Sequence, residues 1–281
     1  MMKKFYFGML LTASLAMAAC SSDDRDTEPV RKTYTLTVNA TKGVNDDANN
    51  ATTRALTLDG STLNASWATT EEVFVEGTNN GPTINFWFKG SIKPQTAGVS
   101  TVLSGTISLP DGTSYTSIQE AIGTISVPLN LQFPRSGDLD YTGQKGTLAD
   151  IAAKYDYATA TIKVNVDNDR IVVIDASTVK FENQQAIVKF TLKTSDGTAL
   201  LSPTALTIEY GDSNLSMSFP AETYATNGEG VIYVAIPGDA SKKLTLTATV
   251  GSDSYTFTKS GVTFDNGQYY AIGLKMKKSG E

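Results

Sequence analysis

The 281-residue sequence contains no histidine and a single cysteine, Cys20. Without histidine the chain cannot build a catalytic triad that uses an imidazole base, and it lacks a principal zinc ligand. One cysteine provides neither an intrachain disulfide nor the ligands of an iron–sulfur cluster. A metal site would need oxygen ligands alone, which favour calcium or magnesium. We therefore expect no enzymatic activity, no cofactor and no metal.

Positive charge is also scarce. The chain has 23 Lys and Arg against 29 Asp and Glu, which gives a net charge of −6. Basic residues cluster only near the C-terminus, at Lys275, Lys277 and Lys278. Binding to a phosphate backbone requires a concentrated positive face. Nucleic acid is therefore not an expected partner.

The first residues have the pattern of a lipoprotein signal peptide. Lys3 and Lys4 precede an apolar run, Phe5 to Ala18, that is too short for a membrane-spanning helix. Small residues then lead directly to Cys20, as in a lipobox. We expect a signal peptide over 1–19 and a lipid on Cys20 that anchors the chain in the outer membrane. The alternative is a plain secretory signal with an incidental cysteine.

A polar tether is expected over 20–32. Ser21-Ser22-Asp23-Asp24 resembles the acidic export tag that some Gram-negative surface lipoproteins carry after the lipidated cysteine. This indicates a lipid-anchored protein displayed on the cell surface. The alternative is that Asp23 and Asp24 only keep the tether soluble, in which case the protein faces the inner side of the outer membrane.

The rest of the chain predicts an all-β fold. Short runs alternate apolar side chains with threonine, as in Tyr34, Leu36 and Val38 of the first run, and turn residues separate the runs. We expect two tandem β-sandwich domains, over 33–176 and 177–281, with one short helix in the first. The first domain should also contain a long surface loop over 128–146, which holds two prolines and three glycines.

The helix begins at a capping box. Thr147 is the expected N-cap, with the Asp150 side chain reaching back to the Thr147 amide. Apolar residues then follow at helical spacing and should form one stripe that packs on a sheet. They are Leu148, Ile151, Ala152 and Tyr155.

The segment from Thr41 to Thr53 has no periodicity and should be a mobile loop. Arg54, followed by Ala55, stands at its end and is the only basic residue between Lys42 and Lys89. An arginine in such a loop is a good target for an arginine-specific protease, because cleavage requires local unfolding. The alternative is an ordinary loop arginine.

Five segments recur in this order in one family of proteins. They are the lipobox at Cys20, the strand Lys32 to Val38, Thr53-Arg54-Ala55-Leu56 leading into Leu58-Asp59-Gly60 and Trp67, the helix start Gly146 to Ile151 and the ending Asn266 to Ala271. With this combination the chain resembles the fimbrillin-like (Mfa-like, type V pilin) lipoproteins. The resemblance covers almost all of the chain after Cys20.

The resemblance implies a mechanical role. Members consist of two transthyretin-like β-sandwiches, and in polymerising members a protease cuts after an arginine beyond the first strand. Carried over here, the cut follows Arg54, the strand Tyr34 to Val38 leaves, and a strand from another subunit fills its groove. Only four residues follow the last expected strand, 268–277. Either that strand is itself donated, or the protein caps, tips or anchors a filament.

Two further motifs contain residue types that can bind ligands. Trp87 is a candidate ligand-contact aromatic, since surface aromatics stack on sugars, although packing is the commoner role of such a residue. Asp167-Asn168-Asp169 matches no calcium loop and reads as a turn. We therefore expect a structural subunit of a pilus or a related adhesin, which assembles with other fimbrillin-like subunits. A host or bacterial surface protein or glycan is a further candidate partner. The alternative is a glycan-binding surface lipoprotein of a nutrient-uptake system.

Overall fold

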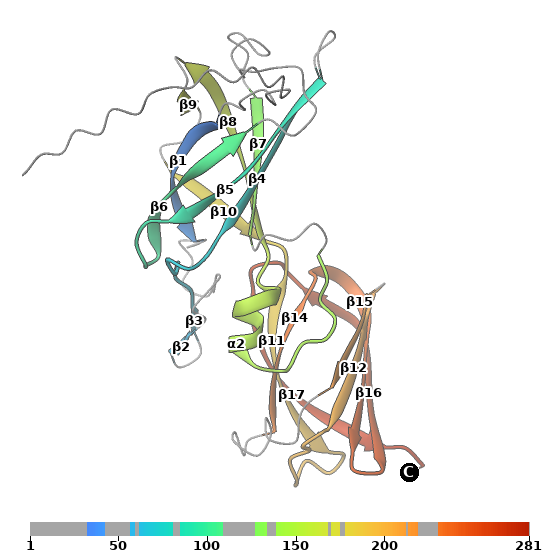
Figure 1. Cartoon of the computed structure of the whole chain (residues 1–281). Coiled ribbons are helices and arrows are strands. Elements are labelled where there is room, and N and C mark those ends of the chain that lie inside the picture. The colour runs from blue at the N-terminus through green and yellow to red at the C-terminus, as the bar shows by residue number, and fades with distance from the viewer. Residues whose placement is uncertain are drawn as a thin grey trace, which may run out of the picture. The chain divides into compact units, whose positions relative to one another are not determined.

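The computed structural model describes residues 33–42, 57–59, 62–80, 85–108, 127–133, 139–167, 170–174, 178–211, 213–218 and 230–280. Within these residues the fold is all-β with one short helical segment, as predicted (Figure 1). The strands form two large sheets, each with its own hydrophobic core, and a small hairpin of β2 (Thr57–Asp59) and β3 (Thr62–Asn64).

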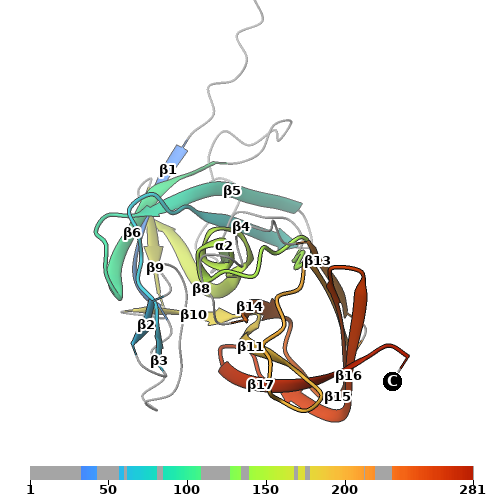
Figure 2. The same ribbon diagram turned by 90° about the horizontal axis from the view of Figure 1, so that it is seen from below.

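The first sheet is closed on itself. Its strand order is β10-β1-β6-β5-β4-β7-β8-β9, and β10 also pairs with β8, so every strand except β9 belongs to a ring (Figure 2). The strands are β1 (Thr33–Lys42), β4 (Val73–Asn80), β5 (Asn85–Pro94), β6 (Ser100–Ser108), β7 (Val127–Phe133), β8 (Ala158–Asp167), β9 (Arg170–Val173) and β10 (Val179–Asn183).

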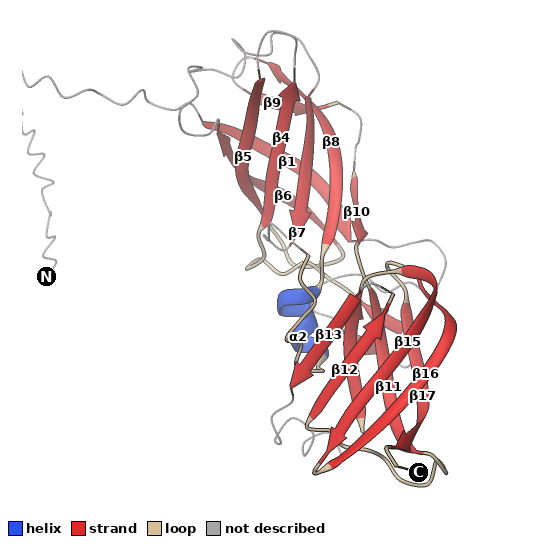
Figure 3. Ribbon diagram, turned by 90° about the vertical axis from the view of Figure 1, so that its right-hand side faces the viewer, coloured by secondary structure: helices blue, strands red, loops and turns tan. Residues whose placement is uncertain are grey.

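The second sheet has the strand order β13-β12-β15-β16-β17-β11-β14 (Figure 3). Most neighbours are antiparallel, but β17 runs parallel to β11 over eight residue pairs. The strands are β11 (Ala186–Thr194), β12 (Ala205–Tyr210), β13 (Ser213–Ser218), β14 (Val231–Ile236), β15 (Asp239–Val250), β16 (Asp253–Phe264) and β17 (Tyr269–Lys278).

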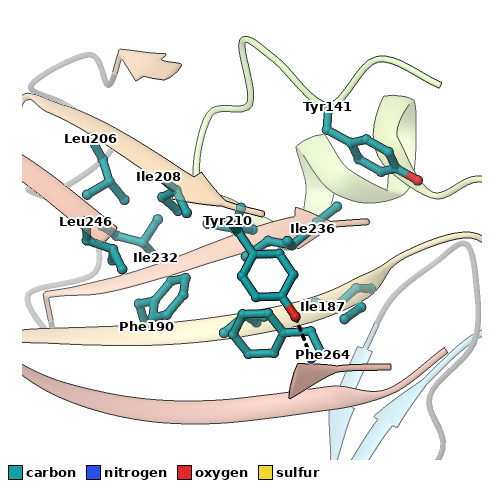
Figure 4. Close-up of a cluster of buried hydrophobic side chains, with 14 of the residues drawn as sticks. Tyr141, Ile187, Phe190, Leu206, Ile208, Tyr210, Ile232, Ile236, Leu246 and Phe264 are labelled. Carbon is teal, nitrogen blue, oxygen red and sulfur yellow. Dashed lines mark hydrogen bonds between the residues drawn. The ribbon is translucent and has the colours of Figure 1, made fainter. Parts of the chain in front are cut away.

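A tyrosine closes one end of the second core (Figure 4). Tyr210, the last residue of β12, is 1 % exposed, and its ring centroid lies 4.9 Å from that of Phe264. The Tyr210 hydroxyl donates to the carbonyl of Asp239 and accepts from the Phe264 N–H at 3.0 Å. Burial raises the pKa of Tyr210. A neutral phenol can thus satisfy backbone groups of two other strands.

The helix consists of α2 (Leu148–Asp150) and a π-helical turn, η1 (Ile151–Tyr155). The Thr147 side chain accepts from the Asp150 N–H at 3.1 Å, as predicted for the N-cap. The Asp150 side chain, however, accepts from the Lys145 N–H at 2.7 Å, whereas the capping box placed it on the Thr147 amide. In chain order the helix lies between β7 and β8, yet its buried residues Ile151 and Tyr155 belong to the core of the second sheet.

The predicted surface loop over 128–146 is wrong in two parts. Residues 128–133 belong to β7, which pairs with both β4 and β8. Pro128 fits because it pairs only with Lys163 of β8, beyond the end of the β4 ladder, so its missing N–H costs no bond there.

The second part is the buried pair Tyr141 and Gln144. The Tyr141 hydroxyl donates to the Gln184 carbonyl at 2.9 Å, and burial raises its pKa. The Gln144 side chain donates to the Tyr141 and Ala235 carbonyls, both at 2.8 Å, and accepts from the Ala235 N–H at 2.7 Å. A polar side chain with all of these partners can be buried without a large desolvation penalty.

Two glycines bring β5 and β6 unusually close together. A Cβ on Gly105 would clash with the Ser91 carbonyl oxygen and lie 2.9 Å from the Ile92 Cα. Gly90 is equally confined, with the Ile107 Cα 2.7 Å from the position of its Cβ. Because backbone atoms form both contacts, no side-chain rotation can relieve them.

We expect Gly105→Ala to lower the free energy of unfolding by about 1–3 kcal/mol, the usual cost of overpacking. The matched control is Gly273→Ala in β17, where a Cβ would have no neighbour within 4 Å. Urea unfolding of both variants checks the prediction. Equal losses in the two variants would contradict it.

Candidate functional site: the seat of the first strand

The first strand has one buried and one exposed face. Tyr34, Leu36, Val38 and Ala40 are at most 3 % exposed, whereas the alternate residues from Thr33 to Asn39 are exposed. The three residues proposed from the sequence therefore lie side by side on the core face of the first sheet. Their predicted exchange with another strand remains a prediction.

The two edges of β1 are held unequally. Along one edge, β1 pairs antiparallel with β6 over nine residue pairs, from Thr33↔Ser108 to Thr41↔Ser100. Along the other edge, it pairs in parallel with β10 over three residues only, Ala40 to Lys42. Among the described residues, β1 thus has a continuous ladder of paired residues along one edge and a short one at the C-terminal end of the other edge. Removing it would break one long ladder and one short one.

The C-terminal end of β1 carries a buried ion pair. Thr41 and Lys42 were predicted to begin a mobile loop, but both pair with β10 and extend the strand. The Lys42 side chain is fully buried, and its Nζ lies 2.8 Å from Oε2 of Glu71, whose side chain is 2 % exposed. The Nζ also donates to the Ser66 carbonyl at 2.9 Å.

Two aromatic rings also lie beside the Lys42 ammonium. Its Nζ lies 4.1 Å from the ring centroid of Trp67 and 5.1 Å from that of Phe133. Trp67 packs edge-on against Phe133 and Phe181, with centroid distances of 5.5 and 5.4 Å. We call the set Ser66, Trp67, Glu71 and Phe133 the cation pocket. All four residues belong to the body that would remain if β1 left.

Sequence reasoning missed Lys42 and Glu71 as site residues. The signal for Lys42 was present, since the alternation that places Tyr34, Leu36 and Val38 inward continues through Ala40 to Lys42. Alternation alone does not predict a buried lysine, because charged residues are rarely buried without a partner. No pattern in the residues around Glu71 indicates its role, because its partner Lys42 lies 29 positions earlier in the sequence.

A shallow hollow beside the outer face of β1 offers no chemistry of its own. Its polar lining residues are Asn39, Thr41, Thr96, Ser100, Thr101 and Thr178. The Thr101 hydroxyl donates to the Thr96 carbonyl at 2.8 Å. None of the lining side chains is charged, so the hollow provides neither a general acid nor a general base.

The remaining sequence-predicted sites are only partly covered. Cys20, Arg54 and Ala55 lie outside the described residues. Trp87 belongs to β5 opposite Thr78, but its side chain lies outside the described part, so its role as a ligand contact stays a prediction. Asp167 ends β8 and pairs with Arg170 of β9, whereas Asn168 and Asp169 lie outside the described residues, so the turn there stays a prediction.

No metal or membrane site emerges from the described part of the chain. Its His, Cys, Asp and Glu residues nowhere gather in groups of three or more that could hold an ion. None of its helices is long and apolar enough to cross a bilayer.

Comparisons with known proteins gave matches among solved structures only. No family model and no curated protein matches the chain. A "putative cell adhesion protein" from Bacteroides ovatus has 15% sequence identity and a TM-score of 0.46, over 89% of this chain and 96% of that one. A fimbrial assembly protein from Parabacteroides distasonis has 12% identity and a TM-score of 0.43, over 89% of this chain and 94% of that one.

Proposed function

We propose that this chain is a lipid-anchored, surface-exposed fimbrillin-like subunit of a pilus or a related adhesin, and that it accepts a strand from another subunit in place of β1. The observation that carries the proposal is the setting of β1. Among the described residues, this strand buries one apolar face and is paired along most of its length on one edge only, and it precedes Arg54 in the sequence. Lipidation of Cys20 would hold the subunit on the outer membrane.

Strand replacement follows from this setting. Cleavage after Arg54 would cut the covalent link between β1 and the rest of the domain. Burial of Tyr34, Leu36 and Val38 is worth about 5–8 kcal/mol by area, an upper estimate. The cut strand therefore stays bound until another strand competes for the same groove. The competing strand regains the β6 ladder and fills the same side-chain positions.

The last strand of the chain is a costly donor. β17 pairs with β11 over eight residue pairs, contacts β16 at two more, and buries Leu274 and Met276 in the second core. Releasing it would break both ladders and open that core. We call the groove that β1 fills, between β6 and β10, the β1 seat. The cost of releasing β17 favours a subunit that accepts a strand at the β1 seat more readily than it donates one, as expected of a capping, tip or anchor subunit.

The test is cleavage followed by competition. After treatment with an arginine-specific protease, the fragment that contains β1 should co-elute with the rest of the chain in size-exclusion chromatography. An excess of a synthetic peptide of residues 33–42 should then displace it. The matched control, Arg54→Gln, should keep β1 covalently linked and resist displacement. Loss of the fragment without any competitor, or no displacement at high peptide excess, would overturn the proposal.

A further inference from the structure

We propose that the cation pocket selects the incoming strand, so that a strand bound in the β1 seat must present a lysine at the position of Lys42. This inference rests on the proposed strand replacement and adds the chemistry of the partner. Lys42 lies on the piece that would leave, while Glu71 precedes β4 on the piece that would stay. After cleavage at Arg54, the ion pair would therefore link the fragment that contains β1 to the rest of the chain.

The pocket matches an ammonium group in particular. Around Nζ of Lys42 stand a carboxylate oxygen, a backbone carbonyl and the faces of two aromatic rings. Carboxylate and carbonyl accept hydrogen bonds from the ammonium, and aromatic faces attract cations. Departure of β1 removes the cation from this buried set. A replacement strand with an apolar end would leave the Glu71 carboxylate buried without the ammonium that now neutralises it.

The seat also sets the spacing that precedes the lysine. Tyr34, Leu36, Val38, Ala40 and Lys42 follow one another at every second residue on the buried face. Parallel pairing of Ala40, Thr41 and Lys42 with β10 holds the lysine in this register. The partner is thus an extended segment of another subunit with an aromatic residue, two aliphatic residues, a small residue and a lysine at alternate positions.

A strand with similar spacing exists in this chain. In β17, Tyr270, Ile272, Leu274, Met276 and Lys278 also stand at alternate positions and end in lysine. Its fourth residue is methionine where the seat holds Ala40, which is 1 % exposed. A peptide of β17 is therefore a second probe of the lysine requirement.

The experiment measures the affinity of fluorescent peptides for the full chain after cleavage at Arg54. The first peptide has the sequence of residues 33–42, and the second carries Lys42→Met. A third carries Thr41→Lys together with Lys42→Met, so it keeps the net charge and moves the lysine to the outer face. We expect the first peptide to bind about 100-fold more tightly than the other two, since removing one partner of a buried ion pair is strongly destabilising.

Two variants of the cleaved chain that binds the peptides complete the design. In Glu71→Leu, the preference for the lysine peptide should fall below about threefold or reverse, whereas Glu76→Leu, which removes an exposed carboxylate near Lys89, should leave it unchanged. The β17 peptide should likewise lose affinity when Lys278 is replaced by methionine. If Glu71→Leu fails to fold, the affinities of the three peptides for the chain with Glu71 intact still test the lysine requirement.

The outcomes separate the two proposals. Equal affinity of the first and second peptides, or of the first and third, would overturn selection by lysine while strand replacement stands. Binding of the β17 peptide that does not depend on Lys278 would overturn it as well. Failure of every peptide to displace the cut strand would overturn strand replacement and, with it, this inference.

Discussion

Replacing Lys42 by methionine is expected to lower the free energy of unfolding of the first domain by about 3–5 kcal/mol, because it leaves a buried carboxylate without its cation. The same change removes the hydrogen bond to Ser66 and the contact with the Trp67 ring. Both tryptophans of the chain, Trp67 and Trp87, belong to the first half, so their fluorescence during urea unfolding reports on this domain.

The double variant Lys42→Met with Glu71→Leu should recover most of that loss, since an apolar pair of similar volume is often as stable as a buried ion pair. Lys89→Met is the matched control. Lys89 lies 3.6 Å from Glu76, and both side chains are nearly half exposed, so about 0–1 kcal/mol should be lost. If the double variant is no more stable than Lys42→Met alone, the coupling between Lys42 and Glu71 is not the source of the effect.

Leu36→Ala should cost about 2–5 kcal/mol, the range for removing a buried leucine side chain from a core that collapses only partly. Leu36 has no exposed surface and lies opposite Gly105 on β6. Because glycine has no side chain, Gly105 cannot fill the cavity that the substitution leaves. After cleavage at Arg54, the fragment that carries Leu36→Ala should also dissociate faster than the unaltered fragment. Fluorescence-monitored unfolding and the dissociation rate of the cut fragment measure the two effects.

Thr35→Ala is the control for Leu36→Ala, because Thr35 lies on the exposed face of the same strand. It should change stability by no more than about 0.5 kcal/mol. Similar losses in the two variants would mean that strand propensity, rather than the buried face of β1, dominates the stability of the seat.

Alternation of side chains was sufficient to predict β1 and its inward residues, because a strand with one buried face repeats every two residues. The loop prediction, which rested on composition, was wrong at Thr41 and Lys42, because both residues pair with β10 and extend the strand. Partners such as Glu71 depend on how distant segments meet, and periodicity contains no information on that. The same limit explains the helix, whose start was predicted correctly at Thr147 while the core that receives it was not.

The prediction of an exposed loop was wrong at Tyr141 and Gln144 for a different reason. Prolines, glycines and polar residues normally mark exposed loops, yet Tyr141 and Gln144 are buried. Gln144 can be buried because its amide bonds to backbone groups at both ends, including those of Ala235. The residue types of a segment show how polar it is. Whether one of its polar side chains is buried depends on hydrogen-bond partners that distant parts of the folded chain supply.

The position of β10 has a consequence for how the protein is made. β10 follows β9 in the chain, and among the described strands it alone joins β1 to β8 and closes the ring. During synthesis, the first sheet therefore cannot close until residues 179–183 are available. Until then β1 and β8 present open strand edges, which are sites for mispairing with other chains. Contacts between segments so distant in sequence also form slowly, so closure of the ring is expected to be a late step in folding.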